Sequence, residues 1–385
     1  MLDFTSALYL GLRHPNGSLR PWASLTWGRP AVLGEPPRAE AVAAELAVLQ
    51  GCERAVLLPS TLHLFLDLFE VLSRDPVAIY LDAGSYPIAR WGAERVSARG
   101  VPLRVFPHHD PDGLRLALGR SPGRRAVVVT DGFCPLCGGA APLSDYLAVI
   151  RRRGGILVVD DTQALGILGQ EPGPAAPYGR GGGGSLRWGK LQGPDILIGA
   201  SLAKGFGVPI AALAGNRGTI ERFSALSSTR VHCSPPSVAV IHAAEHALIL
   251  NRHHGDRLRQ RLAERVRRFR SGLAQIGLAA EGGLFPVQTL RPIADRDALS
   301  LHRALLRRGI RTVPMRRRDR GGARLGFLIT ARHSPLEIDL CVAGLAEVVL
   351  GSGRKPAERS DRLTNVRRVT RVARYPGSFT RRGLE

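Results

Sequence analysis

The sequence predicts an α/β protein whose larger part is built on a mainly parallel β-sheet. Short apolar runs alternate with helical patterns through the first two thirds of the chain, as in βαβ units. The run at 155–161 is continuous, rich in β-branched residues and ends in two aspartates, which is typical of a strand buried on both faces. Hydrophobic residues make up 44% of the 385 residues, enough for a sizeable core.

The elements follow from periodicity along the chain. Alanine-rich and apolar helical patterns cover 36–50 and 60–72, and another covers 143–153. Between and after them, short apolar runs predict strands at 77–81, 103–106, 126–130, 156–160, 195–198 and 210–214. From 235 to about 278 one long helical pattern follows, with a possible break near 251–255. Beyond it, segments 286–290, 298–308, 324–329 and 335–350 predict a small α+β unit.

These elements divide the chain into four parts. We expect an N-terminal arm at 1–35, a large domain at 36–245, a connecting helix with a small C-terminal domain at 246–350, and a tail at 351–385. The tail contains ten basic and three acidic residues, so we expect it to lack stable structure of its own. The net charge is +22, but only three of the 54 basic residues are lysines. Arginine bias therefore runs through the whole chain, which argues against a dedicated nucleic-acid arm.

Three further features bear on location. No stretch of about 18 apolar residues is present, so the sequence predicts no transmembrane helix. The first residues carry neither a basic region nor an apolar signal core. Five cysteines without framework spacing fit a reducing compartment. We therefore expect a cytoplasmic protein without a membrane partner.

Lys204 is a candidate for covalent chemistry. It lies in Ser-Leu-Ala-Lys-Gly-Phe-Gly at 201–207, directly after an apolar strand, and small neighbours let a bulky ligand approach the backbone. A lysine amine can lose its proton and attack a carbonyl, whereas arginine cannot. The alternative is a surface lysine that escaped replacement by arginine.

Asp160 provides the second half of the site. It ends the strand at 156–160, and the carboxyl ends of strands in an open α/β sheet form the ligand-binding edge. A carboxylate beside an imine-forming lysine is what pyridoxal phosphate requires, because it keeps the pyridine nitrogen protonated. A helix cap or a Mg²⁺ ligand remains the alternative for Asp160 and Asp161.

At this point the chain resembles the α-oxoamine synthase group of fold-type-I pyridoxal-phosphate enzymes, the relatives of 8-amino-7-oxononanoate synthase and 2-amino-3-ketobutyrate ligase. The resemblance runs from about residue 3 to 350. Its motifs, in order, are Asp-Phe-Thr-Ser at 3–6, Tyr-Leu-Gly-Leu at 9–12, Thr-Asp-Gly at 130–132, Asp-Asp-Thr-Gln at 160–163, Lys204-Gly205, Pro235-Pro236 and Thr-Ala-Arg-His at 330–333. It implies a large parallel-sheet domain with a smaller α+β C-terminal domain, pyridoxal 5′-phosphate as cofactor, and a homodimer.

The resemblance also implies roles for individual residues. Lys204 matches the Schiff-base lysine, Asp160 the partner of the pyridine nitrogen, and Ser201 a hydroxyl that holds the cofactor phosphate. Ser60, Thr61 and Leu62 match a segment whose backbone N–H groups at a helix start bind that phosphate. Tyr86 falls where the family has a histidine stacked on the cofactor ring, and Gln163 where it has a histidine that contacts the cofactor's phenolic oxygen.

Two departures concern the substrate side. Pro135 replaces a serine near the active site, and Gly326 stands where the family has the arginine that grips the substrate carboxylate. Arg324, Arg316 and Arg332 are the nearby candidates to replace it. The resemblance thus preserves cofactor binding and changes substrate recognition.

Other motifs are weaker. The Cys-Pro-Leu-Cys segment at 134–137 could be redox-active or half of a zinc site, but it has no second pair, so we expect no metal centre. The pairs His108-His109 and His253-His254 are expected at the surface, because adjacent side chains diverge in regular structure. The glycine-rich segment 179–185 is expected to be a flexible loop beside the active site.

The family's reaction condenses an amino acid with an acyl thioester, carried on CoA or a carrier protein, with loss of CO₂. We therefore expect a pyridoxal-phosphate-dependent acyltransferase that acts at Cα of an amino acid. An aminotransferase or lyase on the same scaffold is the alternative. A catalytically idle fold used as a basic binding module is a second one, favoured by the tail and the lost arginine and opposed by Lys204, Asp160 and Ser201.

Overall fold

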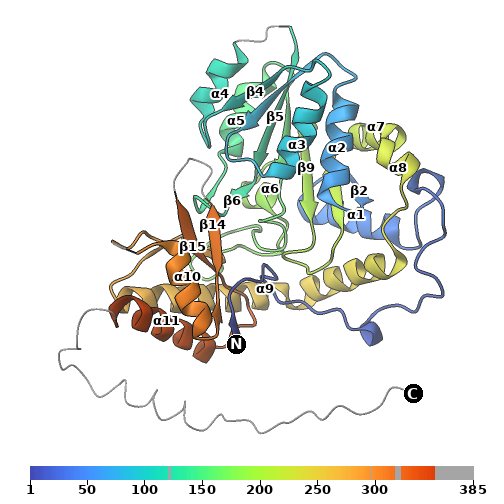
Figure 1. The fold of residues 1–385 in the computed structure, drawn as a ribbon. Helices are drawn as coiled ribbons and strands as arrows, with labels where there is room; N and C mark the ends of the chain where they lie inside the picture. Colours follow the sequence, from blue (N-terminus) through green and yellow to red (C-terminus); the bar gives the residue numbers. More distant parts are fainter. Residues whose placement is uncertain (120–122, 295, 317–321, 352–385) are drawn as a thin grey trace.

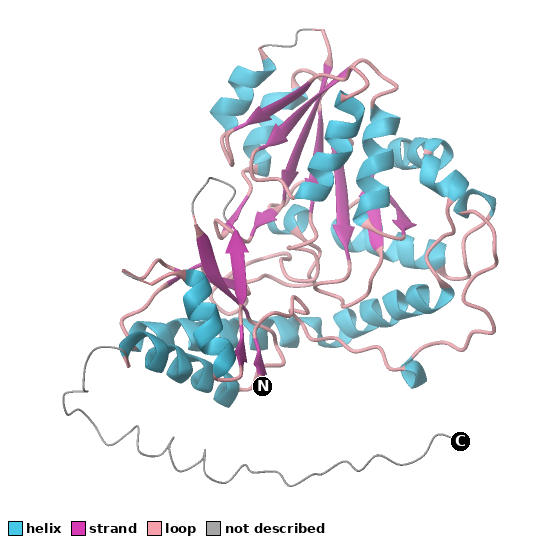
Figure 2. Ribbon diagram, in the orientation of Figure 1, coloured by secondary structure: helices cyan, strands magenta, loops and turns pink. Residues whose placement is uncertain are grey.

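The computed structural model describes residues 1–119, 123–294, 296–316 and 322–351. Its centre is a seven-stranded sheet in the order β2-β10-β9-β8-β5-β3-β4, with helices on both faces (Figures 1 and 2). The expected fold class is confirmed. The strands of this sheet are β2 Arg54–Leu58, β3 Val77–Asp82, β4 Leu103–Phe106, β5 Arg125–Asp131, β8 Ile156–Asp160, β9 Ile196–Ser201 and β10 Ala211–Gly215.

The sheet is parallel except at one edge. β4, β3, β5, β8 and β9 pair in parallel, whereas β10 pairs antiparallel with both β9 and β2. Alternate side chains of each strand enter two different cores: Val127 and Val129 of β5 face one, and Ala126 and Val128 the other. Burial on both faces is why these strands are continuous apolar runs in the sequence.

The helices cover the two faces and connect the strands. The first group is α1 Ala39–Gln50, α2 Thr61–Leu72, α3 Pro87–Ser97, α4 Pro111–Leu118, α5 Leu143–Arg151, α6 Ser185–Trp188, α7 Arg217–Leu226 and α8 Ser228–His232. Helices α1, α2 and α5 lie where the sequence predicts them, whereas no bounds were predicted for α3 and α4. Between β5 and α5 lies a small hairpin of β6 Phe133–Cys134 and β7 Gly139–Ala140.

A second sheet builds the smaller unit. It has the order β11-β12-β15-β14 and is antiparallel, with helices α10 and α11 beside it (Figure 1). The bounds are β11 Ala280–Glu281, β12 Val287–Leu290, α10 Ala298–Arg307, β13 Ile310–Arg311, β14 Val313–Arg316, β15 Ala323–Leu328 and α11 Pro335–Leu350. The N-terminal strand β1 Leu2–Asp3 pairs in parallel with β13, so the arm begins against this smaller unit.

Helix α9, Val238–Gln275, joins the two units as one continuous helix, so the expected break near 251–255 is wrong. Gly255 lies in its middle, where a Cβ would come within 2.4 Å of Asn251 Oδ1 and 2.7 Å of the Arg259 guanidinium. Arg259 is 2% exposed and donates to the Gly166 carbonyl (2.8 Å) and to Asn251 Oδ1 (2.9 Å). Gly255 therefore makes room for a buried arginine, and the hydrogen bonds of that arginine offset the low helix propensity of glycine.

The segment 179–185 differs from its expected role. Gly181 donates its N–H to Asp256 and accepts a hydrogen bond from Asn251, both on α9. None of the described residues of this segment lines the cavity described below. It therefore packs against α9 and does not line the cavity.

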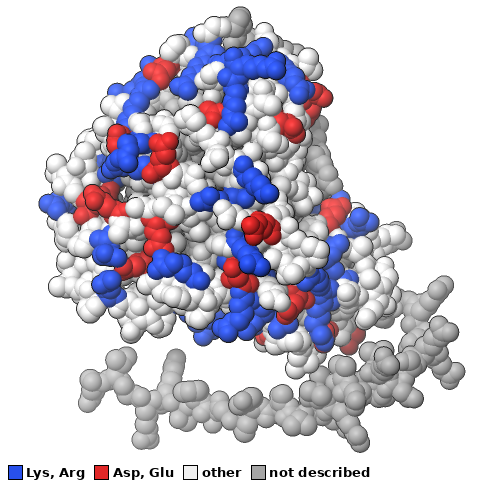
Figure 3. All heavy atoms as spheres, turned by 180° about the vertical axis from the view of Figure 1, so that it is seen from behind, with Lys and Arg blue, Asp and Glu red and all other residues white. Residues whose placement is uncertain are grey.

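The arginine-rich surface carries both signs of charge. Figure 3 shows one face on which Lys and Arg side chains are spread widely with Asp and Glu among them. Several arginines form ion pairs, including Arg20 and Arg38 with the same carboxylate of Glu245. The basic tail expected at 351–385 lies almost entirely outside the described residues. Among the residues that are described, no helix is long and apolar enough to cross a membrane.

Candidate active site

A cavity of about 670 Å³ lies where the carboxyl ends of the central strands meet the smaller sheet. Asp131, Asp160 and Ser201 reach it from the ends of β5, β8 and β9, as expected for an open α/β sheet. The start of α2, the start of α3 and the N-terminal arm add further walls. The smaller sheet closes it with Val287, Val313, Met315 and Leu328.

Lys204 and Asp160 line this cavity together. Burial lowers the pKa of the Lys204 amine, while the nearby carboxylates Asp160 and Asp131 act against that shift. Burial raises the pKa of Asp160, and the hydrogen bond from the Thr162 N–H (3.0 Å) opposes it. An amine with a lowered pKa has a larger unprotonated fraction, so the site favours a nucleophilic lysine.

Asp161, the neighbouring carboxylate, points elsewhere. It does not line the cavity, and its Oδ2 accepts a hydrogen bond from the Ser185 N–H at the start of α6 (3.0 Å). Burial raises the pKa of Asp161 to about 7. Adjacent residues of an extended strand end face opposite sides, so only Asp160 is placed to act in the cavity.

The remaining predicted residues surround Lys204 to different degrees. Tyr86 lies at the start of α3, with the Lys204 Nζ 5.8 Å from its ring centroid and its own N–H donating to Asp131 (2.9 Å). Ser201 lines the cavity, and its hydroxyl accepts a hydrogen bond from the Ala203 N–H (3.2 Å). Of the three residues predicted to bind the phosphate, Thr61 lines the cavity. Its neighbours in the chain, Ser60 and Leu62, do not line it.

Gln163 is held in one orientation by a residue that the sequence analysis did not assign to the site. The Tyr9 hydroxyl donates to Gln163 Oε1 at 2.7 Å, and Tyr9 is 1% exposed. Burial raises the pKa of Tyr9 above its ordinary value, so the hydroxyl keeps its proton and remains a hydrogen-bond donor. With its oxygen occupied, Gln163 presents its NH₂ group as the free donor. Tyr9 appeared only as part of the Tyr-Leu-Gly-Leu motif, and nothing local in the sequence pairs it with Gln163, 154 residues away.

The space beside Gly326, where the family has the arginine that binds the substrate carboxylate, is filled by an apolar side chain. A Cβ on Gly326 would lie 2.4 Å from the Met315 sulfur, and Met315 lines the cavity. Among the described residues, the charged side chains around the cavity are Lys204, Asp160 and Asp131, with no arginine.

The arginines considered as replacements lie elsewhere. Arg324 lies 3.9 Å from Glu281 and lines a different hollow beside α10. Arg332 donates to the Gly11 carbonyl at 2.6 Å and does not line the cavity. Neither arginine therefore lines the cavity in this structure, and the side chain of Arg316 lies outside the described residues.

The residues present fit pyridoxal phosphate. The cavity combines a half-buried amine, a buried carboxylate, an aromatic ring and the N–H groups of a helix start, which are the groups that this cofactor needs. Pro135, the other noted departure, also lines it, so the substrate side is apolar there as well.

Comparison with known proteins agrees with this geometry. A sequence profile of the family "Aminotransferase class I and II" matches residues 38–327. The chain is 32% identical to an 8-amino-7-oxononanoate synthase of Alkalilimnicola ehrlichii, over 83% of this chain and 78% of that protein. It is 31% identical to the protein of the same name from Methylococcus capsulatus, over 90% and 89% of the two chains.

Solved structures show the same fold at lower identity. A serine palmitoyltransferase from Sphingomonas wittichii superposes with a TM-score of 0.78 at 19% identity, covering 92% of this chain and 88% of that one. An 8-amino-7-oxononanoate synthase from Francisella tularensis gives a TM-score of 0.69 at 18% identity, covering 91% and 98%.

The chain belongs to the class I and II aminotransferase family, and it is a fold-type-I transferase that depends on pyridoxal phosphate. Within that family it is a member of the α-oxoamine synthase group, as its ordered motifs predicted.

Proposed function

We propose that the protein condenses an amino-acid substrate with the acyl group of a thioester at Cα, with loss of CO₂ and release of the thiol. Membership of the α-oxoamine synthase group supports this reaction. The observation that carries the proposal is the placement of one half-buried amine, Lys204, and one buried carboxylate, Asp160, at the same cavity.

When bound, pyridoxal phosphate takes up the electrons released at the substrate Cα. Lys204 would hold the cofactor through its amine and move the proton at Cα, which its lowered pKa favours. Asp160 would keep the proton on the ring nitrogen. Gln163, whose oxygen is engaged by Tyr9, would offer its NH₂ group to the ring oxygen, and Ser201 with the N–H groups at the start of α2 would hold the phosphate.

The substrate is recognised differently from the rest of the group. Met315 fills the space beside Gly326, and the adjoining wall consists of Val287, Val313 and Leu328. A free carboxylate placed there would lose its hydration without gaining a bidentate partner, which costs free energy. We therefore propose that simple α-amino acids are poor substrates and that the preferred partner is an unusual or carrier-bound compound.

The first test concerns Lys204. The purified protein should be yellow, and borohydride should fix the cofactor on Lys204, as peptide mapping would show. Lys204→Ala should lose the colour, whereas Lys190→Ala, at an exposed site outside the cavity, should keep it. A cofactor adduct on another lysine in the Lys204→Ala protein would refute the assignment. Failure of the wild type to bind the cofactor would favour the idle binding module.

The second test addresses the reaction. Thiol release is measured with glycine, alanine and serine against several acyl-CoA compounds. Slow turnover with all of them is expected. Rapid turnover with any simple pair would show that the missing arginine is compensated, while amino-group exchange with a keto acid and no thiol release would establish the aminotransferase alternative.

We further propose that the enzyme works as a homodimer in the cytoplasm, as the family resemblance implies. Light scattering coupled to size-exclusion chromatography should give twice the chain mass of 41.4 kDa. A monomer that retains full activity would contradict the dimer.

A further inference from the structure

A cluster of nitrogen and sulfur ligands lies behind one wall of the cofactor cavity and has no part in the proposed reaction. His108 and His109 follow β4, and Cys137 lies in the turn between β6 and β7. One side-chain atom of each lies within 4.8 Å of those of the other two. The sequence predicts no metal centre here and predicts that the two histidine side chains diverge, and this second prediction is wrong.

The local backbone explains why the histidines come together. His109 has φ of 55°, in the left-handed region, so the pair lies in a turn and not in regular structure. Non-glycine residues seldom adopt this conformation, although histidine does so more often than most. The two rings lie with centroids 3.7 Å apart. Gly84 allows this arrangement, because a Cβ there would come within 2.1 Å of His108 Nδ1.

The separations match a metal's coordination sphere. His108 Nε2 lies 3.4 Å from Cys137 Sγ, and His109 Nδ1 lies 3.9 Å from the same sulfur. Tetrahedral Zn²⁺ with ordinary Zn–S and Zn–N bonds places its nitrogen and sulfur ligands about 3.6 Å apart. Mixed imidazole and thiolate ligands favour Zn²⁺ over the hard cations Mg²⁺ and Ca²⁺.

A buried carboxylate supports the cluster from behind. Asp82, 1% exposed at the end of β3, accepts from His108 Nδ1 at 2.7 Å and from the His109 N–H at 3.1 Å. This contact leaves His108 Nε2 directed at Cys137. A carboxylate on the far nitrogen of a ligating histidine is the usual outer partner in zinc sites. The Tyr146 hydroxyl also donates to Asp82, at 3.2 Å, and so fixes the carboxylate.

We propose that His108, His109 and Cys137 bind one Zn²⁺ ion, oriented by Asp82. The thiol of Cys134 lies beside both Cys137 and His108. Cys134, Pro135 and Leu136 line the cofactor cavity, so the ion ties this wall to the ends of β3 and β4. The site is structural, and it is independent of the reaction proposed above.

The test uses untagged, reduced holoenzyme. Elemental analysis after dialysis against Zn²⁺ should give one ion per chain, and replacement by Co²⁺ should give the visible absorption of a tetrahedral cobalt–thiolate centre. Cys137→Ser and His109→Asn should each lose the ion. Asparagine suits His109 because it tolerates a positive φ and lacks the imidazole.

Matched controls come from the same chain. Cys233→Ser changes a cysteine outside the cluster, and His253→Asn changes one of the exposed pair His253-His254, whose ring centroids lie 6.2 Å apart. Both controls should keep one ion per chain. Zn²⁺ should raise the melting temperature of the wild type and the controls, but not that of the cluster variants.

Three results would overturn the proposal. The first is that the reduced wild-type protein binds neither Zn²⁺ nor Co²⁺. The second is that Cys137→Ser and His109→Asn each retain one metal ion per chain. The two cysteines at 134 and 137 could form a disulfide in protein that takes up no metal, which would make the segment a redox pair. The first and third results do not depend on the folding of any variant.

Discussion

The contact between Tyr9 and Gln163 allows a quantitative test of how the N-terminal arm supports cofactor binding. Tyr9→Phe removes the donor to Gln163 Oε1 with almost no change in shape. The amide oxygen then lacks its partner, at a cost of about 1–3 kcal/mol. The amide can also turn over, so that its NH₂ group no longer faces the cofactor.

We expect Tyr9→Phe to weaken cofactor affinity about tenfold, which corresponds to about 1.4 kcal/mol. The measurement is an equilibrium titration of cofactor-free protein with pyridoxal phosphate, followed by absorbance. A double-mutant cycle with Gln163→Leu should give a coupling energy between about 0.5 and 3 kcal/mol, because the residues are in direct contact.

The matched control is Tyr178→Phe. Tyr178 is 3% exposed and its hydroxyl donates to the Leu284 carbonyl, outside the cavity. Tyr178→Phe should lower the free energy of unfolding and leave cofactor affinity unchanged. Equal losses of affinity in the two variants, or no coupling between Tyr9 and Gln163, would show that Tyr9 acts only through general stability.

Three further predictions follow from the site. Asp160→Asn should still bind the cofactor but lose at least about 100-fold in turnover, since an amide cannot stabilise a protonated ring nitrogen. Normal turnover of Asp160→Asn together with an inactive Asp161→Asn protein would show that Asp161 is the partner of the ring nitrogen. For Asp161, the folded pKa of about 7 lies above the ordinary value of 3.8, so this group's contribution to stability is greatest below pH 3.8 and is lost as the pH rises through 7. Asp161→Asn should therefore gain roughly 2–4 kcal/mol relative to wild type between pH 4 and pH 8, and parallel melting curves across that range would refute this. Finally, the double variant Gly326→Arg with Met315→Ala should raise kcat/KM for free amino acids by about 10-fold or more, because it supplies a guanidinium and removes the sulfur that occupies its place. Met315→Ala alone is the control. An equal gain in that control would show that added space, and not the new charge, causes the improvement.

Periodicity predicted the strands of the central sheet except β2, because most of them are buried on both faces and therefore form unbroken apolar runs. The same logic could not reveal that β10 runs antiparallel, since direction depends on how the chain returns and leaves no local pattern. It suggested a break at Gly255 because the buried Arg259 that occupies the space beside this glycine is visible only in three dimensions.

The site divides along the same line. Lys204 and Asp160 could be found because Asp160 ends β8 and Lys204 lies just after the end of β9, and strand ends converge in this fold class. The roles of Tyr9, Met315 and His108 could not be found in this way. Each of these residues meets its partner through a contact between separate segments of the chain. A pair of adjacent histidines carries no sign of the turn that stacks them, and Gly326 alone does not reveal that a methionine from the neighbouring strand fills its place.

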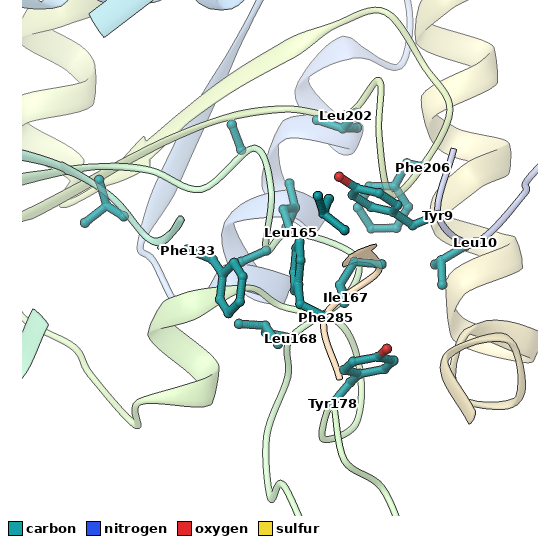
Figure 4. Packing of buried hydrophobic residues seen from close by; sticks show 14 of the residues in the cluster. Tyr9, Leu10, Phe133, Leu165, Ile167, Leu168, Tyr178, Leu202, Phe206 and Phe285 are labelled. Carbon is teal, nitrogen blue, oxygen red and sulfur yellow. The ribbon is translucent and has the colours of Figure 1, made fainter. Parts of the chain in front are cut away.

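The continuity of α9 limits how the molecule can move. Its 38 residues form a rod about 57 Å long that supports both sheets (Figure 1). The stacked rings of Phe133 and Phe285, with centroids 3.9 Å apart, join the β6–β7 hairpin to the loop before β12 (Figure 4). Because α9 is unbroken, any movement of the smaller sheet relative to the larger one would have to carry the helix as one unit. Such a movement would also shift the Phe133–Phe285 contact between the two parts.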